Sequence, residues 1–544
     1  MTTAEPTLPE PLGPARNRPA PRWLVPCLAL AATAMGIVLA RRIGGMTDSV
    51  EYLFAARHLR GGQGYRGLDG NWLADFPPLY PATIALVSMW GLDVLTAARI
   101  VGVAGFVVVA LGCQCWARLL TRSWYAGATA GVAVLLAAPV VLIYANVWSE
   151  ALFSALIVVA GAALTRALLT PRIGSLAWSG IAAAAAVATR YVGVGLVPIG
   201  VAATLLLWPG GRRRRWAAAL TWIAPVAASL VAIVAANLVE TGTPTGDRPP
   251  ATTDLATQLH HLVITVGTWL APTFDVSDRT ATIVGAMSLV IILAITILAA
   301  ATLRRSRATR AEIVTAALPG AILVSLLATI LWSSVTTSID DLDTRLLGPL
   351  SFLLVVHLVV SVHRIASTRV ARRPHIAHRE LEPARTRSPR FVTASLIVMM
   401  VLIIGSSAVV QAERVNSQFR DGRLDALDPA WRHDPLVRWV RAHPDVDVTS
   451  NDPALLAWAT GRTVQYWPDL PARSSVRAEA AALADFTDGV DGSGRRSALV
   501  WYRDEPDPTL LTRGEIAGVC RLRPVASFAG SRIDLVGRCH RART

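Results

Sequence analysis

Long apolar segments alternate with short polar ones over the first three quarters of the chain. About eleven of these segments approach or exceed the roughly 20 residues that a helix needs to cross the hydrocarbon core of a bilayer. Two neighbouring segments are separated only by Arg190 and Tyr191, and we count them as two crossings. The predicted spans are 23–40, 97–117, 125–143, 150–168, 175–189, 192–209, 216–237, 282–303, 311–333, 346–363 and 391–410.

The pattern changes after residue 410. In 411–544 the apolar runs become short and are bounded by Asp, Pro and Gly, and they alternate between strand-like and helix-like periods, which is typical of a small α/β domain. The predicted strands are 446–450, 464–467, 498–502 and 531–536, and the predicted helices are 453–459, 474–486 and 510–519. Residues 1–21, rich in Pro and Arg, are expected to form a disordered cytoplasmic tail, which leaves 22–410 as the membrane domain.

Composition supports a polytopic α-helical membrane protein. The 544 residues are 53% hydrophobic and only 16% charged, with a formal net charge of +15. Lysine is absent, so arginine is the strong cation throughout. The arginines gather in short tracts between apolar spans, which favours membrane topology over nucleic-acid binding.

Arginine placement orients the spans. With the N-terminus inside, the inner loops contain most of the basic tracts, including 212–215, 304–310 and 363–390, as the positive-inside rule requires. The first outer loop, 41–96, carries five arginines against this bias, and the later loops outweigh it. An odd number of crossings then puts 411–544 outside the membrane. Cys520 and Cys539 lie about a hairpin apart there, and an oxidising exterior predicts a disulfide between them.

The first outer loop contains the residues most suggestive of chemistry. Met-Thr-Asp-Ser-Val-Glu-Tyr at 46–52 is followed by Phe-Pro-Pro-Leu-Tyr-Pro at 76–81. Acidic residues beside an aromatic and a Pro-Pro turn make a poor lipid-facing surface, and they indicate an active site at the water interface. Helical spacing places Asp48, Glu51 and Tyr52 on one face. In the alternative interpretation, Thr47 or Asp48 caps this helix and Glu51 closes a capping box.

Other familiar chemistry is absent from the sequence. It contains no Cys-x-x-Cys, His-Glu-x-x-His, Gly-x-x-x-x-Gly-Lys or Gly-x-Ser-x-Gly pattern. The pair His260 and His261 has no evident third ligand and is expected to be solvated. We therefore expect no cofactor, and leave a divalent metal open.

The order of short motifs resembles that of the GT-C superfamily of polytopic glycosyltransferases, especially protein mannosyltransferases and aminoarabinose transferases. Each motif falls on the outer side of the predicted topology, and the resemblance covers roughly residues 22–475. The matching segments are Asp48-Ser49-x-Glu51-Tyr52, Pro77-Pro78-Leu79-Tyr80-Pro81, Trp148-Ser149-Glu150, Thr189-Arg190-Tyr191-x-Gly193, Asp343-x-Arg345-Leu346-Leu347-x-Pro349, Ser450-Asn451-x-Pro453 and Thr460-Gly461-Arg462.

The resemblance implies transfer of a mannose- or arabinose-like sugar from a polyprenyl phosphate to an envelope glycan, glycolipid or protein. One carboxylate at the interface can act as the general base, and arginines can hold the leaving phosphate. Many relatives carry a second acid where this chain has Ser49, so it stays open whether Glu51 takes part in catalysis. The predicted catalytic residues are Asp48 and Glu51, and the predicted substrate-binding residues are Tyr52, Asp75, Glu150, Arg190, Tyr191 and Arg345.

Several of these residues also have a structural interpretation. Arg190 and Arg345 could be snorkelling side chains at span ends, and Glu150 could serve only as a helix cap. Trp23, Trp148, Trp216 and Trp332 are predicted to be anchors at the membrane interface. Two other functions stay open, a flippase for lipid-linked sugars and a non-catalytic envelope assembly protein that binds through 411–544. Membrane lipids are expected partners in all three cases, and nucleic acid is not.

Overall fold

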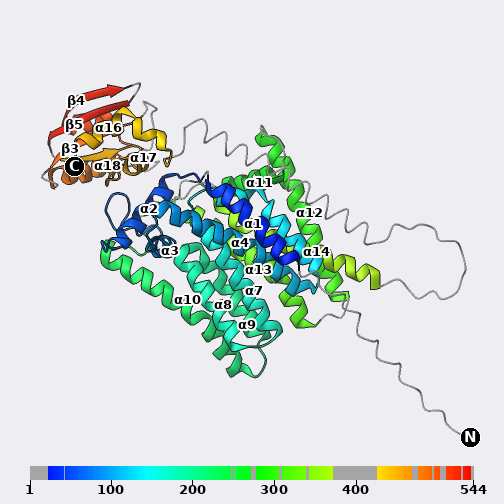
Figure 1. The fold of residues 1–544 in the computed structure, drawn as a ribbon. Coiled ribbons are helices and arrows are strands. Elements are labelled where there is room, and N and C mark those ends of the chain that lie inside the picture. Colours follow the sequence, from blue (N-terminus) through cyan, green and yellow to red (C-terminus); the bar gives the residue numbers. More distant parts are fainter. Residues whose placement is uncertain are drawn as a thin grey trace, which may run out of the picture.

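The computed structural model of the chain describes residues 23–41, 43–246, 248, 250–251, 253–270, 277–305, 309–337, 342–371, 426–468, 476–492, 495–502, 510–528 and 531–540. The predicted tail 1–21, most of the basic segment 363–390 and the predicted span 391–410 lie outside these residues. Two parts are described, a helical bundle and a sheet domain at one end of it (Figure 1).

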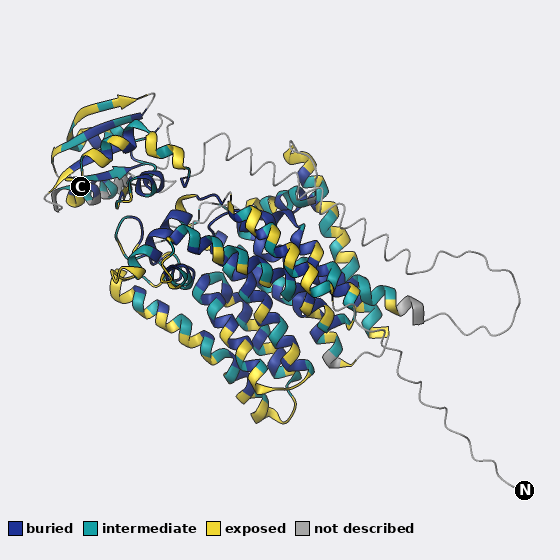
Figure 2. Cartoon of the chain, viewed as in Figure 1, coloured by how far each residue is buried: buried dark blue, intermediate teal, exposed yellow. Residues whose placement is uncertain are grey.

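The bundle is built from long apolar helices. Their bounds are α1 (Leu24–Arg41), α4 (Val94–Thr121), α5 (Trp124–Leu135), α6 (Ala138–Tyr144), α7 (Glu150–Leu169), α8 (Ile173–Thr189), η1 (Tyr191–Gly195), α9 (Leu196–Leu207), α10 (Arg212–Thr241), α11 (Leu255–Leu270), α12 (Asp278–Arg305), α13 (Arg310–Thr336) and α14 (Thr344–Ala371). The centre of the bundle is buried and its outer helices are largely exposed (Figure 2). On α12 the exposed apolar residues Ile283, Met287, Val290 and Ile297 form a stripe at helical spacing, which is the surface that lipid covers.

Seven of the described helices are long and apolar enough to cross a membrane, and an eighth crossing results if α5 and α6 are one bent span. The chain is therefore a polytopic helical membrane protein. All ten predicted spans that fall on described residues coincide with helices. Two of them, α8 and the pair η1–α9, are shorter than a full span, and the helix axes of α5 and α6 differ by 58°. Pro139, in the first turn of α6, lacks the N–H that a continuous helix would use there.

The segment between α1 and α4 folds as two short helices, α2 (Thr47–Arg60) and α3 (Leu79–Ser88). Gly44 connects α2 to the bundle, because its N–H donates to Ala145 O at 2.9 Å and its carbonyl accepts from Val147 N at 3.1 Å. Helix α2 is buried over residues 49–56. It is therefore enclosed by other parts of the protein, although its sequence is too short and polar to be a span.

The sheet domain has a mixed five-stranded sheet with the order β2-β1-β3-β5-β4. Strand β1 pairs in parallel with β2 and β3, whereas β5 runs antiparallel to β3 and β4. The helices and strands are η2 (Pro429–His433), α16 (Pro435–Ala442), β1 (Val446–Ser450), α17 (Pro453–Thr460), β2 (Gln465–Tyr466), α18 (Val476–Gly492), β3 (Arg496–Trp501), α19 (Arg513–Val519), β4 (Cys520–Phe528) and β5 (Ser531–Cys539).

The sheet domain and helix α2 share one hydrophobic core. Val50 and Leu53 of α2 belong to the same buried cluster as Leu455 and Leu456 of α17. The guanidinium of Arg57 lies 4.5 Å from the ring centroid of Trp458. The domain is therefore docked on the helix that carries the predicted active-site acids (Figure 1).

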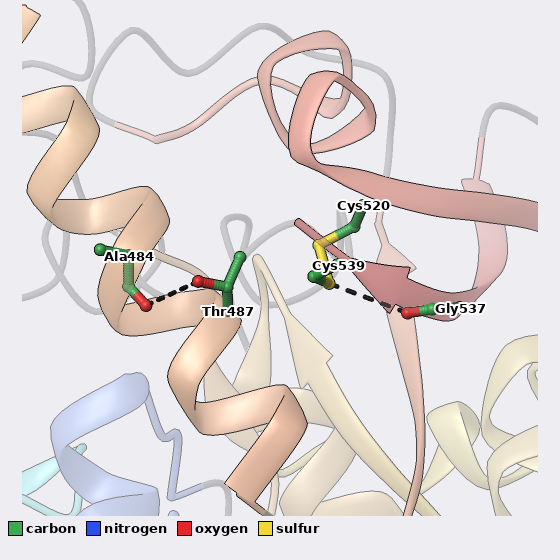
Figure 3. Close-up of a disulfide and its surroundings, with 5 residues drawn as sticks. All are labelled: Ala484, Thr487, Cys520, Gly537 and Cys539. Carbon is green, nitrogen blue, oxygen red and sulfur yellow. Dashed lines mark hydrogen bonds between the residues drawn. A yellow bond between two sulfur atoms is a disulfide. The ribbon is translucent and has the colours of Figure 1, made fainter. Parts of the chain in front are cut away.

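A disulfide closes the outer hairpin of the sheet domain. Cys520 and Cys539 face each other in the β4–β5 register and are joined through their sulfur atoms. Figure 3 shows the bridge beside Ala484 and Thr487 of α18. Cys520 belongs to a small core with Phe486 and Ile516, far along the chain from the predicted chemistry.

Candidate active site

Four charged side chains from separate parts of the chain form one ion-pair chain. Glu150, the first residue of α7, is fully buried, and its Oε1 accepts from Arg190 Nη1 at 2.6 Å and from Arg345 Nε at 3.1 Å. The Nη2 group of Arg345 also donates to Asp48 Oδ2. We call Asp48, Arg345, Glu150 and Arg190 the ion cluster. It brings four of the eight predicted catalytic and substrate-binding residues into direct contact.

Helix starts and ends position these groups. Asp48 lies in the first turn of α2 and Glu150 begins α7, so both carboxylates lie near the positive end of a helix dipole. Arg190 is the C-cap residue of α8, and Arg345 is the second residue of α14. The ends of four elements therefore converge at one point, where each side chain can reach its partners.

The capping interpretation of Asp48 is wrong in this structure. The N-cap of α2 is Met46, and its backbone N–H donates to the hydroxyl of Ser49 at 3.2 Å. Ser49 thus makes the local bond that the interpretation gave to the acids, and the Asp48 carboxylate contacts Arg345. The snorkelling interpretation of the two arginines is also wrong, because their side chains are only 19% (Arg190) and 10% (Arg345) exposed and point into the protein.

Aromatic and hydroxyl groups surround the ion cluster. Tyr52 is 1% exposed, and its hydroxyl lies 3.1 Å from the hydroxyl of Ser149, which also accepts from Arg190 Nη1 at 3.1 Å. Burial, and then the charges of Asp48 and Glu150, raise the pKa of Tyr52. Tyr52 is therefore a neutral hydrogen-bonding group at the edge of the cluster, which it joins through Ser149.

Trp148 is buried beside the ion cluster. The guanidinium of Arg345 lies 5.1 Å from the centroid of its ring, at cation–π distance. Its side chain is 4% exposed, so the prediction that it anchors the membrane interface is wrong, whereas Trp23, Trp216 and Trp332 are exposed as anchors must be. Glu150 pairs with Arg345 and so fixes the guanidinium that contacts the Trp148 ring.

Asp75 and Tyr191 belong to a second cluster. The hydroxyl of Tyr191 donates to Ala74 O at 2.9 Å and accepts from Asn237 Nδ2 at 2.9 Å. The carbonyl of Asp75 accepts from Arg248 Nη2 at 2.6 Å. These bonds, with a further one from Asn237 Nδ2 to Ala74 O at 3.5 Å, fasten residues 74 and 75 to Asn237 of α10, to Arg248 and to the start of η1, one residue beyond Arg190. Asn237 was missed from the sequence, although an amide near the end of an apolar span is a recognisable signal.

Glu51 does not join the ion cluster. Its carboxyl is 4% exposed and accepts from Leu68 N at 2.8 Å and from the hydroxyl of Tyr466 in β2. Burial raises the pKa of Glu51 to about 7, with smaller contributions from Asp69 and Asp48, against the lowering effect of its two hydrogen bonds. No described arginine pairs with it. Sequence spacing placed it on one face with Asp48, and could not reveal that a distant tyrosine covers it.

Among the described residues, no group of three or more His, Cys, Asp and Glu side chains could hold a metal ion. The two carboxylates of the ion cluster are each occupied by a guanidinium. The sequence predicted no cofactor and left a divalent metal open, and no step below uses one.

Comparison with solved structures identifies the fold. ArnT from Cupriavidus metallidurans bound to undecaprenyl phosphate superposes with a TM-score of 0.57 at 13% identity, over 95% of this chain and 98% of that chain. Its apo state gives a TM-score of 0.55 at 14% identity with the same coverage. The Archaeoglobus fulgidus oligosaccharyltransferase in complex with zinc and sulfate gives 0.53 at 9% identity, over 87% of this chain and 67% of that chain.

These structures share the GT-C fold, and this chain therefore has that fold along nearly its whole length, as its motif order predicted. Its sequence is only 9–14% identical to theirs. No protein-family model matches the chain, and no curated protein matches it in sequence.

Proposed function

We propose that this protein is a membrane glycosyltransferase that uses a sugar linked to a polyprenyl phosphate. The observation that carries the proposal is the ion cluster, in which the buried Arg345, the partly buried Arg190 and a carboxylate on a separate helix meet at one end of a GT-C bundle. A guanidinium pair suits a phosphate leaving group, and the Asp48 carboxylate, once it is released from Arg345, suits an attacking hydroxyl. The sugar is mannose- or arabinose-like, and the acceptor is an envelope glycan, glycolipid or protein.

The proposed roles follow from the contacts. Glu150 holds Arg190 and Arg345 together through a single carboxylate oxygen. A donor phosphate that bound both guanidinium groups would compete with Asp48 for Arg345. Asp48 would then be released to accept the proton of the acceptor hydroxyl as its oxygen attacks the anomeric carbon, and the bond from that carbon to the phosphate oxygen breaks. The arginines offset the charge that develops on the leaving phosphate.

The transfer reaction tests this proposal directly. Purified protein in nanodiscs is supplied with a polyprenyl-phosphate sugar or with the corresponding nucleotide sugar, and product is measured for each. We expect transfer only from the lipid-linked donor. Robust transfer from a nucleotide sugar without a lipid carrier would overturn the assignment. Analysis of envelope glycans and lipid-linked sugars in a deletion strain would then identify the sugar and the acceptor.

A flippase of lipid-linked sugars is the competing function. Transport across the bilayer would favour acidic groups at mid-membrane depth. In the seven described candidate spans every Asp and Glu lies in a first or last turn, namely Glu150, Glu240, Asp278 and Glu312. Movement of a labelled lipid-linked sugar between leaflets, without transfer to any acceptor, would replace the glycosyltransferase by this function.

We also propose that the sheet domain lies outside the cytoplasm. The support is that it docks on α2, at the same end of the bundle as the ion cluster (Figure 1). A C-terminal alkaline phosphatase fusion should be active in the bacterial host. A silent phosphatase, together with a fluorescent C-terminal green fluorescent protein fusion, would reverse the orientation.

A further inference from the structure

The niche around Glu51 is assembled from two parts of the chain that lie 415 residues apart. Tyr466 of β2 donates its hydroxyl to Glu51 Oε1, while Leu68 N donates to Oε2 at 2.8 Å. Gly67 completes the niche, because a Cβ atom at this position would overlap Glu51 Oε2. The 65–69 loop can approach the Glu51 carboxyl this closely only because residue 67 has no side chain. The loop is therefore shaped to enclose this carboxyl.

The chain on either side of Tyr466 follows the same loop. Val464 N donates to Leu68 O at 3.2 Å, and Gln465 Nε2 donates to Asp69 O at 2.9 Å. On the other side of the junction, Arg57 of α2 packs over Trp458. Helix α2 is therefore held between the helical bundle and the sheet domain, and the Tyr466–Glu51 bond is one of the bonds that cross this contact.

We propose that Tyr466 is a positioning residue of the active site. By holding the Glu51 carboxyl, it fixes helix α2 and thereby keeps Asp48, one helical turn away, against Arg345. The role of Asp48 in transfer rests on the proposed function, whereas the docking of the sheet domain through Tyr466 does not.

The charges around Glu51 make this docking sensitive to pH. The titratable groups that face it are Tyr466 from β2, Asp69 from the loop and Asp48 from α2, and none of them is a cation. With a folded-state pKa of about 7 against an ordinary value of 4.5, the folded protein holds a proton on Glu51 that the unfolded chain releases. The contribution of Glu51 to stability is thus fully present below about pH 4.5 and is lost as the pH rises through 7. The sheet domain should be held more tightly at pH 5.5 than at pH 8.5.

Hydrogen exchange of the full chain in nanodiscs tests the contact, with protection factors corrected for intrinsic exchange at each pH. Tyr466→Phe removes only the hydroxyl. At pH 5.5 the amides of 47–60 and 65–69 should lose protection by roughly three- to tenfold, the range for one hydrogen bond. Tyr125→Phe, an exposed tyrosine of α5, is the matched control and should change nothing. Unchanged protection in Tyr466→Phe would overturn the proposal.

Two further measurements separate positioning from simple packing. Glu51→Gln retains an acceptor and a donor in the niche, so the difference in protection between pH 5.5 and 8.5 should disappear. Tyr466→Phe should lower kcat several-fold with the donor KM unchanged. Lower protection in Tyr466→Phe with an unchanged kcat would overturn the positioning role. If the difference in protection between pH 5.5 and pH 8.5 survives in Glu51→Gln, the pH dependence does not come from protonation of Glu51. A wild-type protein with no transfer activity would instead contradict the proposed function, and the exchange results would still stand.

Discussion

Asp48 and Glu51 lie one turn apart on the same helix, yet their surroundings are opposite. Asp48 is neutralised by the guanidinium of Arg345, whereas Glu51 is enclosed by a backbone N–H and a phenol with no described cation in contact. The side chains are chemically almost identical, so their partners decide what they do. An acid held by a cation can be released when an anion competes for that cation, and an acid held by neutral donors is instead suited to fastening two parts of a protein together.

The largest effect should come from Asp48→Asn. The amide keeps the size of the side chain but cannot accept the proton of an acceptor hydroxyl, so the rate of transfer should fall by roughly two to four orders of magnitude. Thermal unfolding of the variant should stay close to that of the wild type. Near-normal turnover would show that Asp48 is not the base and that the contrast with Glu51 is structural only.

Glu150→Gln should have the next largest effect, this time on stability. It removes the buried carboxylate that Arg190 and Arg345 share, and breaking a buried ion pair in this way costs about 3 kcal/mol or more. Glu51→Gln is the matched control, because the niche already favours a neutral group, and it should be nearly neutral at pH 5.5. Denaturant or thermal unfolding in detergent measures both. Equal losses of stability in the two variants would show that Glu150 and Glu51 do not differ in their electrostatic surroundings as described.

Arg190→Gln should weaken use of the donor more than use of the acceptor. One of the two guanidinium contacts to the phosphate is lost, and we expect kcat/KM for the lipid-linked donor to fall about tenfold or more, which corresponds to one charge-assisted hydrogen bond. Arg213→Gln, in the exposed first turn of α10, is the matched control. Parallel losses for donor and acceptor would argue against a phosphate site at Arg190.

The smallest effect on transfer should come from the disulfide. Replacing Cys520 and Cys539 with Ser opens a closed loop with a sequence separation of 19 residues, which should cost the sheet domain about 3 kcal/mol. Transfer at low temperature should be unchanged, since neither cysteine contacts α2 or the ion cluster. A loss of activity in the folded variant would mean that the outer hairpin takes part in the site.

The sequence predicted most of the bundle, because membrane crossings need long apolar runs that are readable at any position. It also predicted β1 and α17 closely, since Pro453 marks the helix start and alternation marks the strand. It missed α3, α11, α16 and β4. The sequence of α16 is strongly amphipathic but only 8 residues long, and β4, with Pro524 and Arg521, lacks a clear apolar alternation.

The candidate active site could also be predicted only in part, but the reason differs from that for the fold. Asp48, Glu150, Arg190 and Arg345 could be singled out because each lies in a short motif on the predicted outer side of the membrane. Their pairing depends on how helices far apart in the sequence converge, and no local pattern carries that information. Tyr466 was read simply as part of a strand. Its importance comes from a carboxyl 415 residues earlier, and a single sequence does not show such a contact.

The core shared by α2 and the sheet domain also has a consequence for biosynthesis. The ribosome makes Glu51 long before Tyr466, and at about 5–20 residues per second a separation of 415 residues takes roughly 20–80 s. During that interval the apolar face of α2 and the Glu51 carboxyl lack their cover. A chain truncated before β2 should therefore present this uncovered helix to chaperones and proteases. The sheet domain thus completes the cover of α2, and a protein truncated before β2 should be degraded rather than accumulate in the membrane.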